Sequence, residues 1–218
     1  MAKEMNYHDE LNKKNVLKLR EILETLPAFC RQFFRGIEDT TATRTRIAYA
    51  YDLRVFFEFI HKTNGVYRNT DIVDFPLSIL DQIGREDIEE YMEYLSYYVK
   101  DGVEYMNDER GKKRKLASLR SFYNYFYRNE LISTNPAVLV PLPKLHEKEI
   151  VRMEPNEVAV LLDEVEDGSG LTKKEMSYHQ KNGTRDLALL TLLLGTGIRV
   201  SECVGLDLND VDFDNQRL

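Results

Sequence analysis

The sequence predicts an all-α, or mainly α, protein built in two parts. Apolar residues recur at the spacing of amphipathic helices along most of the 218 residues. Three of the six prolines fall within the stretch "NPAVLVPLP". Because proline removes backbone donors and favours extended conformations, this stretch is expected to join the two parts as a linker.

The composition fits a folded globular protein. Hydrophobic residues make up 43% of the chain and charged residues 31%, which excludes a disordered protein. The longest apolar run, Leu187–Leu194, is too short to cross a bilayer, and the first residues lack the apolar region of a secretory signal. The two cysteines and four histidines are scattered, so we expect no metal site and a reducing, cytoplasmic location.

The first part is expected to hold four longer helices and one short one. Residues 8–26 have apolar side chains at helical spacing and stop at Pro27. A short helical piece then carries three phenylalanines. Asn-Gly and Pro76 indicate a loop at 64–76. The remaining elements expected here are a helix at 43–62, a helix at 85–100, a polar insertion at 101–108 and a helix at 111–129.

The second part is expected to begin with a helix at Pro155, since proline suits the first position of a helix. A polar, glycine-containing surface excursion follows at about 167–181. Residues 184–195 predict a buried helix that closes at Gly195, and Val211–Phe213 predicts the start of a strand.

Charge is segregated along the chain. The net charge is −7, yet Glu109–Arg128 holds seven Lys or Arg against one acid, and Gly84–Glu109 holds nine acids against two bases. The cations gather in the first turns of a predicted helix, where the helix dipole disfavours them. An arriving anion such as a phosphate backbone would explain this placement, and a solvated lysine-rich turn is the alternative.

The stretch "GTGIRVSE" places one arginine beside a rigid apolar helix. Glycine can end a helix with positive φ, and Glu202 follows Arg199 by one helical turn on the same face. A guanidinium held this way matches the oxygens of a phosphate, with the acid as an orienting partner. Taken alone, these fragments are better explained by an ordinary turn and an ordinary helical ion pair.

The longer string Thr184–Asp212 resembles the segment around the first catalytic arginine of the tyrosine recombinases, the phage integrase family, and especially the bacterial Xer-type enzymes. Upstream, Ala48–Leu53 is similar to a helix of that family's core-binding domain, and residues 115–137 and "PLPKL" resemble its last helix and linker. The residues that match around the arginine are Arg185, Asp186, Thr196, Gly197, Arg199, Ser201, Glu202, Leu206 and Asp210.

The resemblance implies three segments. Residues 1–140 would form a helical, SAM-like core-binding domain of the four-helix-bundle type, 141–152 a linker, and 153–218 the helical start of a mixed α/β catalytic domain. In this family the two domains clamp duplex DNA. The residues that would contact the DNA here are Thr43, Arg44, Thr45, Arg46, Lys113, Arg114, Lys115, Ser118, Arg120 and Lys144.

The family's chemistry is attack of a tyrosine hydroxyl on a phosphate, with no metal or cofactor. Arg199 matches the first catalytic arginine and Glu202 its supporting acid. The family's later lysine, His-x-x-Arg pair and tyrosine have no counterpart between Val200 and Leu218. The chain is therefore expected to be the N-terminal part of a recombinase, inactive alone, whose complete form acts as a tetramer with like or related subunits.

Two alternatives stay open at this point. A naturally short DNA-binding module could occupy recombination sites without chemistry, as a regulator. A helical interaction protein would bind no nucleic acid at all, and reversing the charge of Lys113 or Arg114 would then change no DNA affinity.

Overall fold

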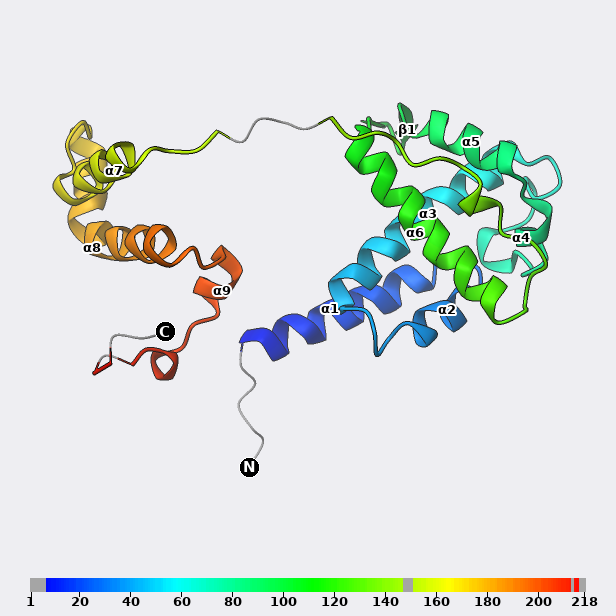
Figure 1. Cartoon of the computed structure of the whole chain (residues 1–218), viewed down its shortest axis with the longest axis horizontal. Helices are drawn as coiled ribbons and strands as arrows, with labels where there is room; N and C mark the ends of the chain where they lie inside the picture. The colour runs from blue at the N-terminus through cyan, green and yellow to red at the C-terminus, as the bar shows by residue number, and fades with distance from the viewer. Residues whose placement is uncertain (1–6, 147–150, 213, 216–218) are drawn as a thin grey trace. The chain divides into compact units, whose positions relative to one another are not determined.

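The computed structural model describes residues 7–146, 151–212 and 214–215, and it divides the chain into two compact units, Met1–Glu147 and Lys148–Leu218 (Figure 1). In the described residues the regular structure is helical apart from one two-stranded hairpin. The prediction of a mainly helical protein is confirmed. None of the described helices combines the length and apolar character needed to cross a membrane.

The first unit is a helical bundle in which α3 packs against both α1 and α6. Asp108 caps the start of α6, where its side chain accepts a hydrogen bond from the backbone N–H of Gly111 at 2.8 Å. The helices of this unit are α1 (Tyr7–Leu23), α2 (Cys30–Gly36), α3 (Thr43–Thr63), α4 (Ile79–Gln82), α5 (Arg85–Tyr94) and α6 (Glu109–Arg128), with short 3-10 turns η1 (Ile72–Asp74) and η2 (Pro136–Val138).

Aromatic rings form the centre of this bundle. Phe122 of α6 is fully buried, and its ring lies 5.2 Å from that of Phe33 on α2 and 6.0 Å from that of Phe57 on α3. Both contacts have the edge-to-face geometry that aromatic pairs prefer. One side chain therefore joins three helices, and burying a ring of this size contributes about 1.5–3 kcal/mol.

The region after α5 differs from the prediction. The helix expected at 85–100 ends at Tyr94, and the expected polar insertion is a hairpin of β1 (Tyr98–Lys100) and β2 (Val103–Tyr105). Asp101 and Gly102 form its turn with φ of 51° and 76°. Two left-handed residues give the turn twist that antiparallel strands favour, and Asp-Gly is a sequence that adopts it readily. Lys100 also pairs with Glu58 of α3, which holds the hairpin on the bundle.

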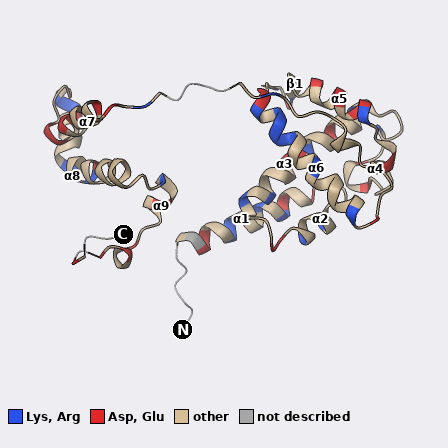
Figure 2. Cartoon of the chain, viewed as in Figure 1, with Lys and Arg blue, Asp and Glu red and all other residues tan. Residues whose placement is uncertain are grey.

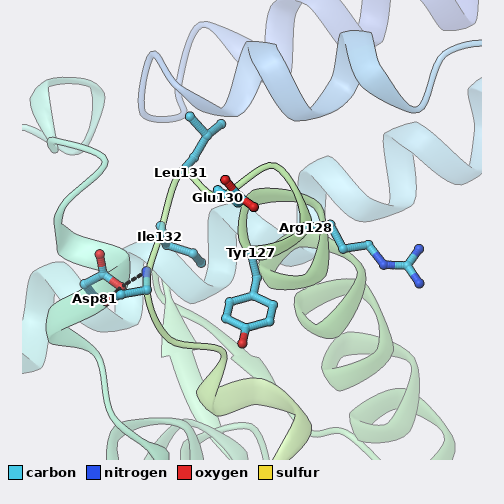
Figure 3. Close-up of a pocket in the computed structure, with 7 residues that line it drawn as sticks. Asp81, Tyr127, Arg128, Glu130, Leu131 and Ile132 are labelled. Atoms are coloured by element: carbon cyan, nitrogen blue, oxygen red, sulfur yellow. Dashed lines mark hydrogen bonds between the residues drawn. The ribbon is translucent and has the colours of Figure 1, made fainter.

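The side chain of Asp81 anchors the segment after α6. Asp81 accepts hydrogen bonds from the backbone N–H and the hydroxyl of Ser133, at 2.8 and 2.9 Å. Figure 3 shows this anchor beside a pocket of about 470 Å³, with Arg128 pointing away from the carboxylate. Burial favours a higher pKa for Asp81, but the hydrogen bonds from Ser133 and Thr134 outweigh it and leave the pKa lowered.

The second unit consists of α7 (Pro155–Asp167), α8 (Lys173–Thr196), α9 (Val200–Val204) and a 3-10 turn η3 (Leu208–Asp210). Most of the predicted surface excursion at 167–181 is the first part of α8. Thr172 caps this helix reciprocally with Glu175, a Thr-x-x-Glu pattern that signals a helix start. The helix ends at Thr196, and Gly197, with φ of 67°, takes the left-handed position that was expected at Gly195.

The second unit differs from the first in burial. No residue of α7, α8 or α9, all of which the structure describes, is buried. The expectation of a buried helix at 184–195 is therefore wrong, because α7 covers only part of the apolar surface of α8 and leaves Leu189 and Leu194 exposed at 41% and 43%. The strand predicted at Val211–Phe213 lies partly outside the described residues.

Candidate nucleic-acid interface

The first half of α6 carries most of its positive charge. Figure 2 shows these basic residues in blue along the helix and the acidic residues of α5 in red. Asp108, the N-cap, and Glu109 place acidic groups at the helix start. Their negative charge offsets the unfavourable interaction between the helix dipole and the cations that follow. The cations of these first turns are Arg110, Lys112, Lys113, Arg114 and Lys115.

A buried carboxylate on α3 organises part of this charge. Asp52 is 2% exposed and pairs with the guanidinium of Arg114 and, at 3.3 Å, with Lys115 Nζ. Its Oδ2 also accepts a hydrogen bond from the hydroxyl of Ser118 at 2.7 Å. A buried carboxylate is tolerated when it is paired and hydrogen-bonded, and here all three donors come from α6. The Asp52 cluster, defined by these four residues, therefore locks α3 to α6.

The members of the Asp52 cluster face solvent to different degrees. The side chain of Arg114 is 50% exposed, so its guanidinium has free donors on the side away from Asp52. The side chain of Lys115 is 10% exposed, and Ser118 is fully buried. Of the three α6 residues predicted to contact DNA in this cluster, the structure thus presents one at the surface and uses two inside the protein.

Lys113 and Lys112 complete the outer side of the first turns. Lys113 is partly exposed, and its side chain has no hydrogen bond or ion pair to another described residue. Lys112 donates from its ammonium to the hydroxyl of Ser96, next to the hairpin. Lys113 is therefore a cation of this face that is free to bind an external anion.

The predicted DNA contacts at the start of α3 also fall into exposed residues and residues that make contacts within the protein. Arg44 and Thr45 are exposed, whereas Arg46 is 7% exposed. Arg46 donates to Glu38 Oε1 at 2.9 Å and to Thr43 Oγ1 at 3.3 Å, and Thr43 in turn donates to the side chain of Asn12 at 3.0 Å. Arg46 and Thr43 thus tie the helix start to its neighbours, and Arg44 and Thr45 remain available at the surface.

The last two predicted DNA contacts of the first unit, Arg120 and Lys144, also differ in their contacts within the protein. Arg120 donates from Nε to the carbonyl of Ala137 at 3.0 Å and from a terminal nitrogen to the carbonyl of Val140. It fixes the chain as it leaves the bundle through η2. Lys144 is exposed and has no described partner.

In the second unit, Arg199 and Glu202 form a local pair. Arg199 is the residue before α9, its backbone N–H donates to Glu202 Oε2 at 2.9 Å, and its guanidinium donates to Oε1 at 3.0 Å. These bonds, the backbone one first, lower the pKa of Glu202. The side chain of Arg199 is 82% exposed, so the acid orients the guanidinium while most of its donors face solvent.

The organising role of Asp52 was missed by reasoning from the sequence. One signal was available: Asp52 directly precedes Leu53 and lies within one turn of Phe56, both of which are buried on α3. A charged residue on the apolar face of a helix needs a partner. The sequence did not show which of the chain's many cations would supply it.

Comparisons with known proteins show which family these features resemble. Residues 151–218, which include Arg199 and Glu202, match the phage integrase family. The chain is 32% identical over 212 residues to the tyrosine recombinase XerC of Caldanaerobacter subterraneus, covering 94% of this chain and 53% of that protein. It is 28% identical over 221 residues to XerS of Streptococcus mutans, covering 90% and 61%. A stretch of 100 residues, 46% of this chain and 29% of the relative, is 44% identical to XerC of Bacillus subtilis.

These matches confirm the predicted resemblance to tyrosine recombinases of the Xer type. The chain spans about half the length of the curated relatives it matches. No solved structure matches it.

Proposed function

We propose that this chain is part of a site-specific tyrosine recombinase and that its 218 residues bind duplex DNA without cleaving it. The observation that carries the proposal is the Arg199–Glu202 pair, which lies inside the region that matches the phage integrase family and is oriented by two hydrogen bonds. The likeness to Xer recombinases over most of the chain supports the same assignment.

The DNA-binding surface is assigned to the exposed members of the predicted set. Arg44, Thr45, Lys113, Lys144 and the outer side of Arg114 contact the phosphate backbone. The remaining members act indirectly, through contacts within the protein that hold the helices in place, and they are Thr43, Arg46, Lys115, Ser118 and Arg120. Backbone contacts of this kind position a protein on DNA and carry little sequence information.

In the complete enzyme, a tyrosine hydroxyl attacks the scissile phosphorus, and the bond to the 5′ oxygen breaks. The products are a 3′-phosphotyrosyl link and a free 5′-hydroxyl, and attack by another 5′-hydroxyl reverses the step. The guanidinium of Arg199 binds the non-bridging oxygens as negative charge builds on them, and its hydrogen bond to Glu202 keeps the guanidinium oriented. The residues after Val200 include no lysine, histidine or tyrosine, so these 218 residues do not supply the nucleophile in the family's order.

The proposed partners are a double-stranded recombination site and further recombinase subunits, which form a tetramer on DNA in the complete enzyme. We place the protein in the cytoplasm with this DNA.

The test is binding of the 218-residue chain to a labelled duplex of about 30 base pairs, measured by anisotropy over a range of salt concentrations. Lys113→Glu is expected to lower the affinity about tenfold at low salt and to reduce the salt slope by about 1. Lys174→Glu makes the same charge change at an exposed position of α8 outside the assigned surface, and it should leave affinity unchanged.

Two results would contradict the proposal. Equal affinity of wild type and Lys113→Glu would remove α6 from the DNA-binding surface. A covalent protein–DNA adduct after incubation with supercoiled DNA would show that these residues contain a nucleophile of their own.

A further inference from the structure

A groove of about 330 Å³ lies between α1 and α2, next to the start of α3. Both helices present one face to it. On α1 the lining residues follow helical spacing from Val16 to Leu23, and on α2 the spacing from Arg31 to Arg35 does the same. The helices themselves lie low in the view of Figure 1. None of the exposed residues assigned to DNA binding lines this groove.

The groove is strongly positive. Arg20, Arg31 and Arg35 are exposed along it, and none of their three guanidinium groups has a hydrogen bond or ion pair to another residue that the structure describes. Its acidic lining residue, Glu38, is already paired with Arg46, the fourth arginine of the lining, at 2.9 Å. Three guanidinium groups thus face one groove without a described counter-charge.

The groove is also apolar at its base. Leu19 and Phe34 are buried there, and Val16 and Leu23 are half-buried, so their side chains present hydrocarbon between the arginines. A phosphate backbone gains nothing from hydrocarbon of this kind, whereas an amphipathic helix can lay apolar side chains on it and direct acids to its edges. Two helices packed side by side also form a groove between them into which a third helix can pack.

We propose that this groove binds an acidic, amphipathic helix of a protein partner. Aliphatic side chains of the partner contact Val16 and Leu23, and its carboxylates pair with Arg20, Arg31 and Arg35. This is a site for protein recognition, separate from the DNA-binding surface on α6.

The probe is a synthetic helical peptide of about 15 residues, with leucine at i, i+3, i+4 and i+7 and glutamate at the flanking positions. Its binding to the full 218-residue chain is measured by fluorescence anisotropy at low salt. The same peptide with lysine in place of glutamate is the control for charge.

The decisive variant is Arg31→Gln/Arg35→Gln. Both side chains are exposed without described contacts, so the variant should keep the wild-type thermal unfolding midpoint, and it should bind the acidic peptide about tenfold more weakly. Lys113→Gln, which removes one positive charge from the α6 surface, should bind the peptide as tightly as wild type. Leu23→Gln should also weaken binding, because the apolar contact is part of the site.

Three outcomes would overturn the proposal. The wild-type chain could fail to bind the acidic peptide, or it could bind the acidic and lysine peptides alike. Alternatively, Arg31→Gln/Arg35→Gln could lose affinity for duplex DNA and keep its affinity for the peptide, which would make the groove an extension of the nucleic-acid surface. The last comparison also separates this inference from the proposed DNA binding, which Lys113→Glu tests independently.

Discussion

The acid–arginine pairs Asp52–Arg114 and Arg199–Glu202 have opposite character. Asp52 and Arg114 are 62 residues apart in the chain and meet because α3 packs on α6, with the carboxylate buried. Arg199 and Glu202 are three residues apart and meet through the geometry of one helix start, with both side chains exposed. The first pair depends on the tertiary structure of its unit, while the second requires only local backbone geometry.

This contrast reflects the two units as a whole. The first unit has an extensive aromatic core, whereas α7, α8 and α9 of the second unit contain no buried residue. Side chains of the first unit are therefore placed by packing, and those described in the second are placed mainly by capping interactions. The predictions below test this difference.

The largest effect is expected from the aromatic core. Phe122→Ala should destabilise the first unit by about 3–5 kcal/mol, because it removes a fully buried ring that joins three helices. The matched change Leu190→Ala, at a half-buried position of α8, should cost less than about 1 kcal/mol. Hydrogen exchange with mass spectrometry reports each unit separately, and similar losses in both would contradict the contrast.

The Asp52 cluster should give the next largest effect. Asp52→Ala leaves Lys115 almost fully buried without its carboxylate, and we expect a loss of about 3 kcal/mol in the free energy of unfolding. Asp186→Ala removes an exposed carboxylate that pairs with Arg185 and should change stability by less than about 0.5 kcal/mol. Urea denaturation followed by circular dichroism measures both, and a loss below about 1 kcal/mol for Asp52→Ala would mean that the cluster does not lock the helices.

Asp81 should contribute a smaller, pH-dependent amount. Its pKa is lowered in the folded state, so its stabilisation is present above the ordinary carboxyl pKa and is lost as the pH falls through the lowered value. Asp81→Asn should reduce stability by about 1 kcal/mol at neutral pH. The difference from wild type should shrink as the pH falls below about 4, and a difference that stays constant down to pH 2 would exclude titration of Asp81 as its source.

The smallest effect concerns the local pair. The lowered pKa of Glu202 means that its support of α9 is present above the ordinary glutamate value and weakens as the pH falls through the lowered one. Because the backbone N–H of Arg199 is the main cause, Arg199→Ala should leave most of the lowering in place, as measured by NMR titration of the Glu202 carboxyl. Return of the pKa to its ordinary value in Arg199→Ala would show that the guanidinium is the main cause.

Local signals in the sequence predicted the elements that depend on local geometry. The helices expected from apolar spacing at 8–26, 43–62 and 111–129 occur with ends shifted by up to three residues. Two local signals were overlooked, the Asp101-Gly102 turn and the Thr172-x-x-Glu175 helix start, and each accounts for one wrong element.

The placement of charged groups could not be predicted in the same way. Nothing in the local sequence distinguishes Arg44, which is exposed, from Arg46, which is buried and bonds Glu38. Arg120 similarly looks like a surface cation until the carbonyls of Ala137 and Val140 are placed beside it. Whether a cation faces solvent depends on which helices pack around it, and the sequence does not specify that packing locally.

The separation of Asp52 from its partners also affects the order of events during protein synthesis. When the ribosome has added Asp52, the 62 residues up to Arg114 are still to be translated. At about 5–20 residues per second this takes roughly 3–12 s. During that time the carboxylate has none of its α6 donors, and α3 cannot bury that face without leaving a charge unpaired. The nascent first unit therefore has to wait for α6, and a chaperone that binds the exposed apolar side of α3 would act in that interval.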